Sequence, residues 1–199
     1  MRYALRSCAM SILLLLVAVS AGGAAKNTND FEKGYYNYDK PLRLLLGGQK
    51  RDSKPPKILI EKGKRRLTIL SGDRAVKSYP VVFGFNPVED KLREGDGCTP
   101  EGIFAIRSKY HHKLWSRFLW IDYPNKGSFK KYEDAKKKGR IEADAAIGGA
   151  VGIHGVPSGS DNLIDEGRNW TLGCISLKNR DIEEIYEFVE AGTSVEIKR

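Results

Sequence analysis

Three runs rich in β-branched and aromatic residues follow one another from Lys57 to Phe85. Gly63 separates the first two runs, and the cluster Ser71-Gly72-Asp73 separates the second from the third. Runs of this composition divided by turn residues are typical of β-hairpins. The pattern therefore predicts antiparallel strands at 57–62, 66–71 and 74–83.

After Phe85, the sequence patterns that indicate strands and helices are more widely spaced. After a loop rich in glycine, proline and charge, we expect a strand at 103–108, and an exposed helix at 129–138 that ends at Gly139. A glycine-rich strand then carries His154. Near the end, Asn179 is expected to cap a helix with apolar residues at helical spacing, before a last strand at 193–198. These elements predict a mainly-β single domain with a few helices, built as a β-sandwich or mixed sheet.

The first 25 residues have the layout of a secretory signal peptide. Two arginines, Arg2 and Arg6, precede an apolar stretch over 9–19, and small residues follow up to Ala25. The apolar stretch is shorter than the roughly 20 residues that span a bilayer. An uncleaved N-terminal anchor is the alternative. We interpret 1–25 as the signal peptide, 26–55 as a leader or linker with one short helix or strand near Leu42–Leu46, and 56–199 as the domain.

The charge balance indicates the kind of partner. The formal net charge is +9, and removal of 1–25 leaves +7, from 32 Lys and Arg against 25 Asp and Glu. A basic exported protein suits anionic partners such as peptidoglycan stem carboxylates, acidic wall polymers or lipid headgroups. Nucleic acid fits export poorly. The alternative is that the excess of cations only maintains solubility.

Two cysteines, Cys98 and Cys174, remain after the first 25 residues. A small exported domain held together by disulfides would have more. Either the two cysteines pair or at least one thiol is free. An unpaired thiol in an exported protein suits catalysis, although a lone cysteine is often a small buried apolar residue.

Two short segments have the local setting that a cysteine nucleophile needs. They are Gly152-Ile153-His154-Gly155 and Thr171-Leu172-Gly173-Cys174. A thiol attacks as thiolate and needs a base, which His154 would supply. Gly173 leaves room for a substrate, and the backbone amides of 172–174 are candidates to bind an oxyanion. The remaining histidines, at 111 and 112, are adjacent and do not give a zinc-site spacing, so we expect no metal.

These segments resemble the L,D-transpeptidase catalytic domain (YkuD type), in which a histidine is followed by Ser/Thr-x-Gly-Cys. Here the match is His154 with Thr171-Leu172-Gly173-Cys174. The hairpins at 57–84, the turn Thr99-Pro100-Glu101-Gly102, Tyr123-Pro124-Asn125 and the last helix are also similar to the family, so the resemblance covers roughly residues 57–198.

The resemblance implies a role for each matching position. Cys174 would attack a peptidoglycan stem tetrapeptide and release D-alanine, and His154 would act as general base and acid. The Gly155 carbonyl would orient the His154 ring, Gly173 and Cys174 would supply oxyanion amides, and Thr171 would hold the loop. No metal or organic cofactor is implied. The acceptor would be a neighbouring stem peptide or a wall-attached protein. The enzyme would be a monomer in the periplasm or cell wall, acting in wall organisation and cell shape.

The chain departs from the family at several positions. Many members have histidine where this chain has Leu172, and arginine where it has Ser176, so substrate contacts at Ser176 and Trp170 are open. Trp170 lines the cleft or belongs to the core. Cys98 is either a spectator, which we favour, or a partner in a redox-labile disulfide with Cys174.

Three functions are compatible with this sequence. The first is an L,D-transpeptidase. The second is an L,D-carboxypeptidase or amidase that uses the same Cys174 and His154 with water as acceptor. The third is a non-catalytic protein that binds the cell wall through its basic surface, because a fold can be kept after its activity is lost.

Overall fold

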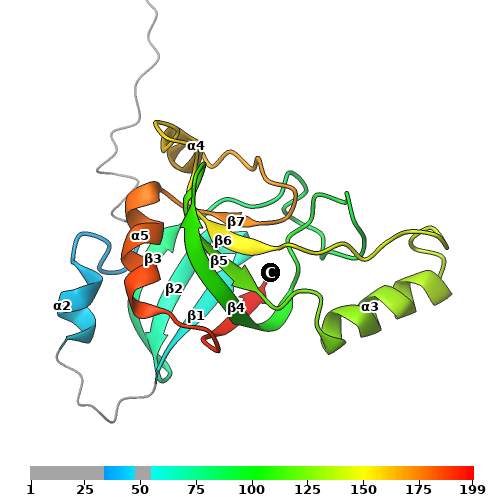
Figure 1. The fold of residues 1–199 in the computed structure, drawn as a ribbon, viewed down its shortest axis with the longest axis horizontal. Helices are drawn as coiled ribbons and strands as arrows, with labels where there is room; N and C mark the ends of the chain where they lie inside the picture. The colour runs from blue at the N-terminus through cyan, green and yellow to red at the C-terminus, as the bar shows by residue number, and fades with distance from the viewer. Residues whose placement is uncertain (1–33, 48–54) are drawn as a thin grey trace, which may run out of the picture.

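The computed structural model describes residues 34–47 and 55–199. Eight strands form one curled sheet in these ranges, with helices around it (Figure 1). The strands are β1 (Pro56–Glu61), β2 (Arg66–Ser71), β3 (Arg74–Pro80), β4 (Gly102–His112), β5 (Ser116–Ile121), β6 (Gly152–His154), β7 (Ile175–Ser176) and β8 (Ser194–Lys198). The helices are α2 (Leu42–Leu46), α3 (Lys126–Lys137), α4 (Asn162–Asp165) and α5 (Asn179–Phe188), with a 3₁₀ turn at Lys62–Lys64.

The strand order is β3-β2-β1-β8-β4-β5-β6-β7. Most neighbours are antiparallel, but β8 runs parallel to β1 and β7 runs parallel to β6. The mainly-β fold with a mixed sheet, expected from the sequence, is therefore confirmed.

Apolar residues from neighbouring strands line up to form the core. Ile58 of β1 lies opposite Ile69 of β2 and Val195 of β8, and all three are buried. Because side chains alternate between the two faces of a strand, the next row on this face comes two residues further along. That row consists of Ile60, Leu67 and Ile197. Full burial of each such side chain contributes roughly 1.5–3 kcal/mol to folding.

Strand β4 connects the two halves of the sheet, because it pairs with β8 at its start and with β5 along the rest of its length. Its first residues, 102–105, pair with β8, and its residues from Ile106 onward pair with β5, with a register shift between Ile106 and Ser108. The two ends of the sheet approach each other where Val82 forms a bridge with Ser176 of β7, through N–H to carbonyl hydrogen bonds of 3.0 and 2.9 Å. The sheet is therefore curled, and its closing edge carries β7.

Two strands differ from the expected lengths. The third run ends as a strand at Pro80, before the expected position 83, because the chain then changes partner from β2 to β7. Strand β4 extends to His112, four residues beyond the expected end, because β5 pairs with it across the whole hairpin.

The two longer helices are present, with different starts. Helix α3 begins at Lys126, three residues earlier than expected, because the Asn125 side chain caps it by accepting from the Ser128 N–H at 3.2 Å. The cap predicted for α5 is wrong: Asn179 is the first residue of the helix, and Lys178 precedes it. The Asn179 side chain instead accepts a hydrogen bond from the Val156 N–H at 3.1 Å.

Residues 34–47, interpreted from the sequence as leader or linker, pack onto the domain. Helix α2 contacts β3, and both Tyr38 and Leu42 are buried in the main core. The Tyr38 hydroxyl donates to Asp181 of α5 at 2.7 Å. The proposed signal peptide lies outside the described residues. No helix within 34–47 or 55–199 is long and apolar enough to span a bilayer.

Candidate functional site

A cavity of about 520 Å³ lies at the end of the sheet that carries β6 and β7. Three segments form its walls: the β4–β5 hairpin, the chain leading into β6, and the loop before β7. Their lining residues are Tyr110, Trp115 and Phe118, then Gly149, Ala150, Val151 and His154, then residues 170–174. Most of these side chains are apolar or aromatic, as is usual for ligand pockets.

The register of the sheet brings His154 and Cys174 to this one cavity. In the parallel pair β6–β7, Ile153 lies opposite Ile175 and His154 lies opposite Ser176. Cys174 is the residue just before β7, and residues two apart on a strand share a face. The pairing therefore places the Cys174 thiol on the same side of the sheet as the His154 ring.

The His154 ring is buried and fixed on several sides. Its Nδ1 lies 2.6 Å from the Gly155 carbonyl oxygen. Because a carbonyl only accepts, Nδ1 carries the hydrogen, and Nε2 is the basic nitrogen of the neutral ring. The Trp115 ring stacks on His154 with centroids 4.4 Å apart, and Phe118, its register partner on β5, stacks at 5.6 Å.

Burial of His154 sets its charge state. The residue is 1% exposed, and burial lowers its pKa to about 4, because a charged imidazolium loses its hydration there. The hydrogen bond to the Gly155 carbonyl opposes this effect only in part. The ring is therefore neutral at pH 7 and is able to accept a proton.

The Cys174 thiol is also neutral in the resting site. Its Sγ donates to the Ala150 carbonyl at 3.7 Å. Burial raises the pKa of the thiol, while a hydrogen bond from the Gly152 amide and the charge of Lys91 act in the opposite direction. A raised thiol pKa beside a lowered histidine pKa favours the neutral pair, so the proton would move to His154 as the sulfur attacks.

Thr171 holds the nucleophile loop from within. Its hydroxyl donates to the Cys174 carbonyl at 2.7 Å and accepts from the Gly173 N–H at 3.2 Å. The Gly173 amide, which the resemblance assigned to the oxyanion hole, is therefore already engaged by Thr171. Gly173 itself has φ of +137°, and a Cβ there would lie 2.6 Å from the Cys98 carbonyl oxygen, so only glycine fits.

The structure places the other two expected substrate residues differently. Trp170 lines the cavity, and its ring meets His154 edge-on at 5.7 Å. Ser176 is fully buried, is not among the lining residues, and donates to the Gly155 carbonyl at 3.1 Å. Ser176 was expected to contact the substrate, but in the structure it instead contacts the carbonyl that orients His154.

Sequence reasoning missed the aromatic wall of the β4–β5 hairpin. Trp115, Phe118 and Tyr110 lie 36 to 44 positions before His154 and belong to no short motif. The available signal was the density of aromatic residues around a turn, in the segment Tyr110 to Trp120. That density fits a buried strand equally well, so only the sheet pairing assigns these rings to the cavity.

The remaining cysteine and histidines take no part in the cavity lining. Cys98 is buried, and both it and Cys174 are free thiols. His112 accepts from the N–H groups of Leu114 and Trp115 at its Nδ1. Within the described part of the chain, no cluster of three or more His, Cys, Asp or Glu side chains is placed to hold a metal ion.

Known proteins resemble this chain in sequence or in fold. The family model of the L,D-transpeptidase catalytic domain (YkuD) matches residues 55–197. A Bacillus licheniformis protein named "Putative L,D-transpeptidase YkuD" is 27% identical over 155 residues, which cover 77% of this chain and 72% of that protein.

Two solved structures of the helical cell shape determining protein Pgp2 from Campylobacter jejuni resemble the fold. A mutant form shows a TM-score of 0.53 and 21% identity, covering 76% of this chain and 49% of that chain. The other form shows a TM-score of 0.50 and 20% identity, covering 81% and 55%. The chain thus spans about half the length of these two proteins.

Proposed function

This chain belongs to the L,D-transpeptidase catalytic domain family, and on that premise we propose that it is a cysteine acyltransferase of peptidoglycan. The donor would be a stem tetrapeptide, and the reaction would release its terminal D-alanine and form a new amide link. The observation that carries the proposal is one cavity that holds both the Cys174 thiol and a neutral His154 oriented through Nδ1.

In the first half of the reaction, Cys174 Sγ forms a bond to the carbonyl carbon of the third stem residue. His154 Nε2 takes the thiol proton at the same time. The Cys174 backbone N–H would stabilise the oxyanion, since the Gly173 amide is engaged by Thr171. Collapse breaks the carbon–nitrogen bond to D-alanine, whose amine takes the proton from His154, and a thioester remains.

In the second half, an acceptor amine attacks the thioester carbon. His154 takes a proton from that amine, the carbon–sulfur bond breaks, and the thiol of Cys174 is restored with the proton. The weakly polar walls formed by Trp115, Phe118 and Trp170 would limit the entry of water, which would otherwise hydrolyse the thioester. This apolar lining favours transfer to an amine over hydrolysis.

The test is to incubate the purified protein with disaccharide-tetrapeptide fragments and identify the products by mass spectrometry. We expect loss of D-alanine together with a joined dimer, and neither product from Cys174→Ala. Cys98→Ala is the matched control, because it removes the other described free thiol, and it should retain the activity.

Two other outcomes would change the assignment. Loss of D-alanine without a dimer would make the protein a carboxypeptidase, and an unchanged tetrapeptide with the native chain would favour a wall-binding role. We also propose that the protein is exported and acts at the cell wall as a monomer. Its acceptor would be a neighbouring stem peptide or a wall-attached protein.

A further inference from the structure

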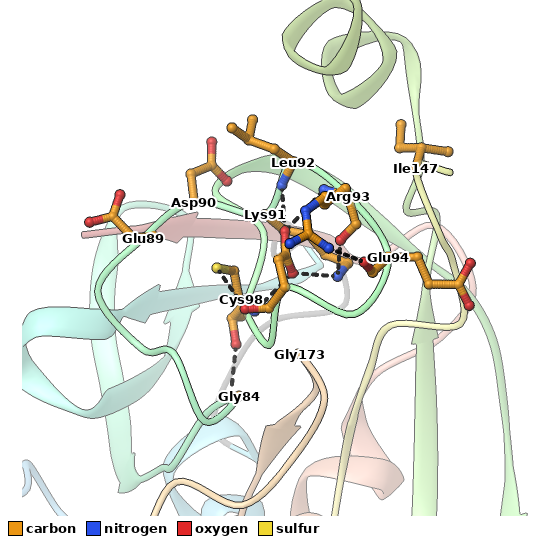
Figure 2. A network of polar contacts seen from close by, with 12 residues as sticks. Gly84, Glu89, Asp90, Lys91, Leu92, Arg93, Glu94, Cys98, Ile147 and Gly173 are labelled. Carbon is orange, nitrogen blue, oxygen red and sulfur yellow. Dashed lines mark hydrogen bonds and ion pairs between the residues drawn. The ribbon is translucent and has the colours of Figure 1, made fainter. Parts of the chain in front are cut away.

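A buried lysine lies behind the nucleophile loop. Lys91 belongs to the loop between β3 and β4, and its side chain is only 4% exposed. Lysine is almost never buried to this extent without a partner. Here the ammonium donates to Asp96 Oδ1 at 2.8 Å and to the Arg93 carbonyl at 3.0 Å. Figure 2 shows Lys91 and Arg93 on this loop.

The loop that carries Lys91 is in direct contact with the residue before the nucleophile. Gly173 lies so close to the Cys98 backbone that a Cβ on it would come within 2.6 Å of the Cys98 carbonyl oxygen and 3.9 Å of Lys91 Cδ. Figure 2 shows Gly173 beside this loop. The Lys91 side chain therefore passes next to the backbone that carries Cys174.

Asp96 fixes the position of this lysine. Its carboxylate accepts backbone hydrogen bonds from Leu92 at 2.8 Å, Arg93 at 3.0 Å and Cys98 at 3.0 Å. Burial alone would raise the pKa of Asp96, but these hydrogen bonds and the one from Lys91 lower it overall. The loop thus holds an ion pair in one geometry, with the Lys91 side chain 4% exposed and the Asp96 side chain 13% exposed.

We propose that Lys91 is an electrostatic positioning residue, whose buried charge stabilises the thiolate of Cys174 and the oxyanion that forms beside Gly173. The inference rests on the proposed function for its catalytic consequence. Its effect on the thiol itself is measurable without any substrate. The charge of Lys91 is one of the effects that lower the pKa of the Cys174 thiol, against burial, which raises it.

The competing explanation is purely structural: the ion pair would only hold the loop in shape. The two members of the pair separate these explanations. Lys91→Met and Asp96→Asn both break the ion pair, but Lys91→Met removes the cation while Asp96→Asn leaves it uncompensated. An electrostatic role predicts opposite effects on Cys174, whereas a structural role predicts the same effect from both.

The experiment measures the rate at which iodoacetamide alkylates Cys174 in the full chain between pH 6 and 10. Trypsin places Cys174 and Cys98 on separate peptides, 169–178 and 94–107, so mass spectrometry follows each thiol without further mutation. We expect Lys91→Met to raise the apparent pKa of Cys174 and to slow its alkylation at pH 7 by about 3- to 10-fold. Asp96→Asn should leave the rate unchanged or increase it, and Lys91→Arg should restore most of the native rate.

Slower alkylation of Cys174 in both Lys91→Met and Asp96→Asn would overturn the proposal, as would a native rate in Lys91→Met. If Lys91→Met does not fold, Lys91→Met combined with Asp96→Asn leaves no unpaired buried charge and should show the same slow alkylation. Failure of the proposed function is distinguishable, because stem peptides would then stay intact while the alkylation rates still differed.

Discussion

At the scale of single residues, one carbonyl oxygen opposes the effect of burial on the pKa of His154. The Gly155 carbonyl accepts from His154 Nδ1 at 2.6 Å and from Ser176 Oγ at 3.1 Å. Because the two donors share this oxygen, Ser176→Ala should strengthen the bond to His154 and stabilise the charged ring. We expect the pKa of His154 to rise and the acidic limb of kcat/KM to move up by about half a pH unit. A limb that stays in place or moves to lower pH would contradict this prediction.

The close contact between Gly173 and the Cys98 backbone leads to a second prediction at this scale. Gly173→Ala would place a Cβ against the Cys98 carbonyl oxygen at a residue with positive φ. The loop must then shift, so we expect activity to fall at least 10-fold and the protein to lose more than about 1 kcal/mol of stability. Gly159→Ala is the matched control, because Gly159 also has positive φ but open space around it. Equal losses in the two variants would contradict the steric argument.

Residue-level chemistry was predictable where it depends on local sequence. The segments around His154 and Cys174 indicated a nucleophile and a base, and the structure places both in one cavity. The contact of Ser176 with the Gly155 carbonyl was not predictable, because sheet pairing brings these distant residues together. The engagement of the Gly173 amide by Thr171 is local, but it depends on the backbone conformation of the loop. Lys91 carried no sequence signal either, since buried and exposed lysines look alike in a sequence.

At the scale of elements, the β4–β5 hairpin controls the environment of the base. The Trp115 ring covers His154, and burial is the main cause of its low pKa. Trp115→Ala should admit water, so we expect the pKa of His154 to rise from about 4 toward its usual value, and the acidic limb of activity to move to higher pH. Trp120→Ala, on β5 of the same hairpin but outside the cavity lining, is the control. NMR titration of His154 provides the same measurement without substrate, and an unshifted titration would refute the prediction.

The predictability of the elements follows the strength of their patterns. The first three strands and both longer helices have clear periodicity or turn residues, and all five are present. The glycine-rich strand expected at His154 is present as β6, with only three residues. Strand β7 contains two residues, which is too short for any period to show. The long arm of β4 was missed because its pattern is set by pairing with β5 rather than by alternation along its own sequence.

At the scale of the whole molecule, the contact between Tyr38 and Asp181 ties residues 34–47 to α5. Burial raises the pKa of Asp181 to about 6, although the Tyr38 hydrogen bond and nearby cations lower it. The folded carboxyl therefore binds its proton more tightly than the unfolded one, and its contribution to stability is lost as pH rises from about 4 to about 6. Asp181→Asn should remove this dependence, on the order of 2 kcal/mol. Denaturant unfolding of both proteins at pH 4.5 and pH 7 measures it, and parallel changes in the two would contradict it.

This long-range contact also shows why the docking of the N-terminal segment was not predictable. Tyr38 and Asp181 are 143 positions apart, and the segment from 34 to 47 has too little periodicity to indicate a buried face. The same holds for the strand order, in which neighbours in space are often distant in the chain. Local patterns indicate which elements form, whereas their arrangement depends on the burial of the whole core.

The position of β8 has a consequence for how the protein is made. The strand Ser194–Lys198 lies between β1 and β4, so it joins the two halves of the sheet although it is synthesised after the other seven described strands. A growing chain on the ribosome lacks the centre of its own sheet, and domains fold as units. The sheet must therefore stay open until β8 has left the ribosome, and an open chain is the form that the proposed export across a membrane would require.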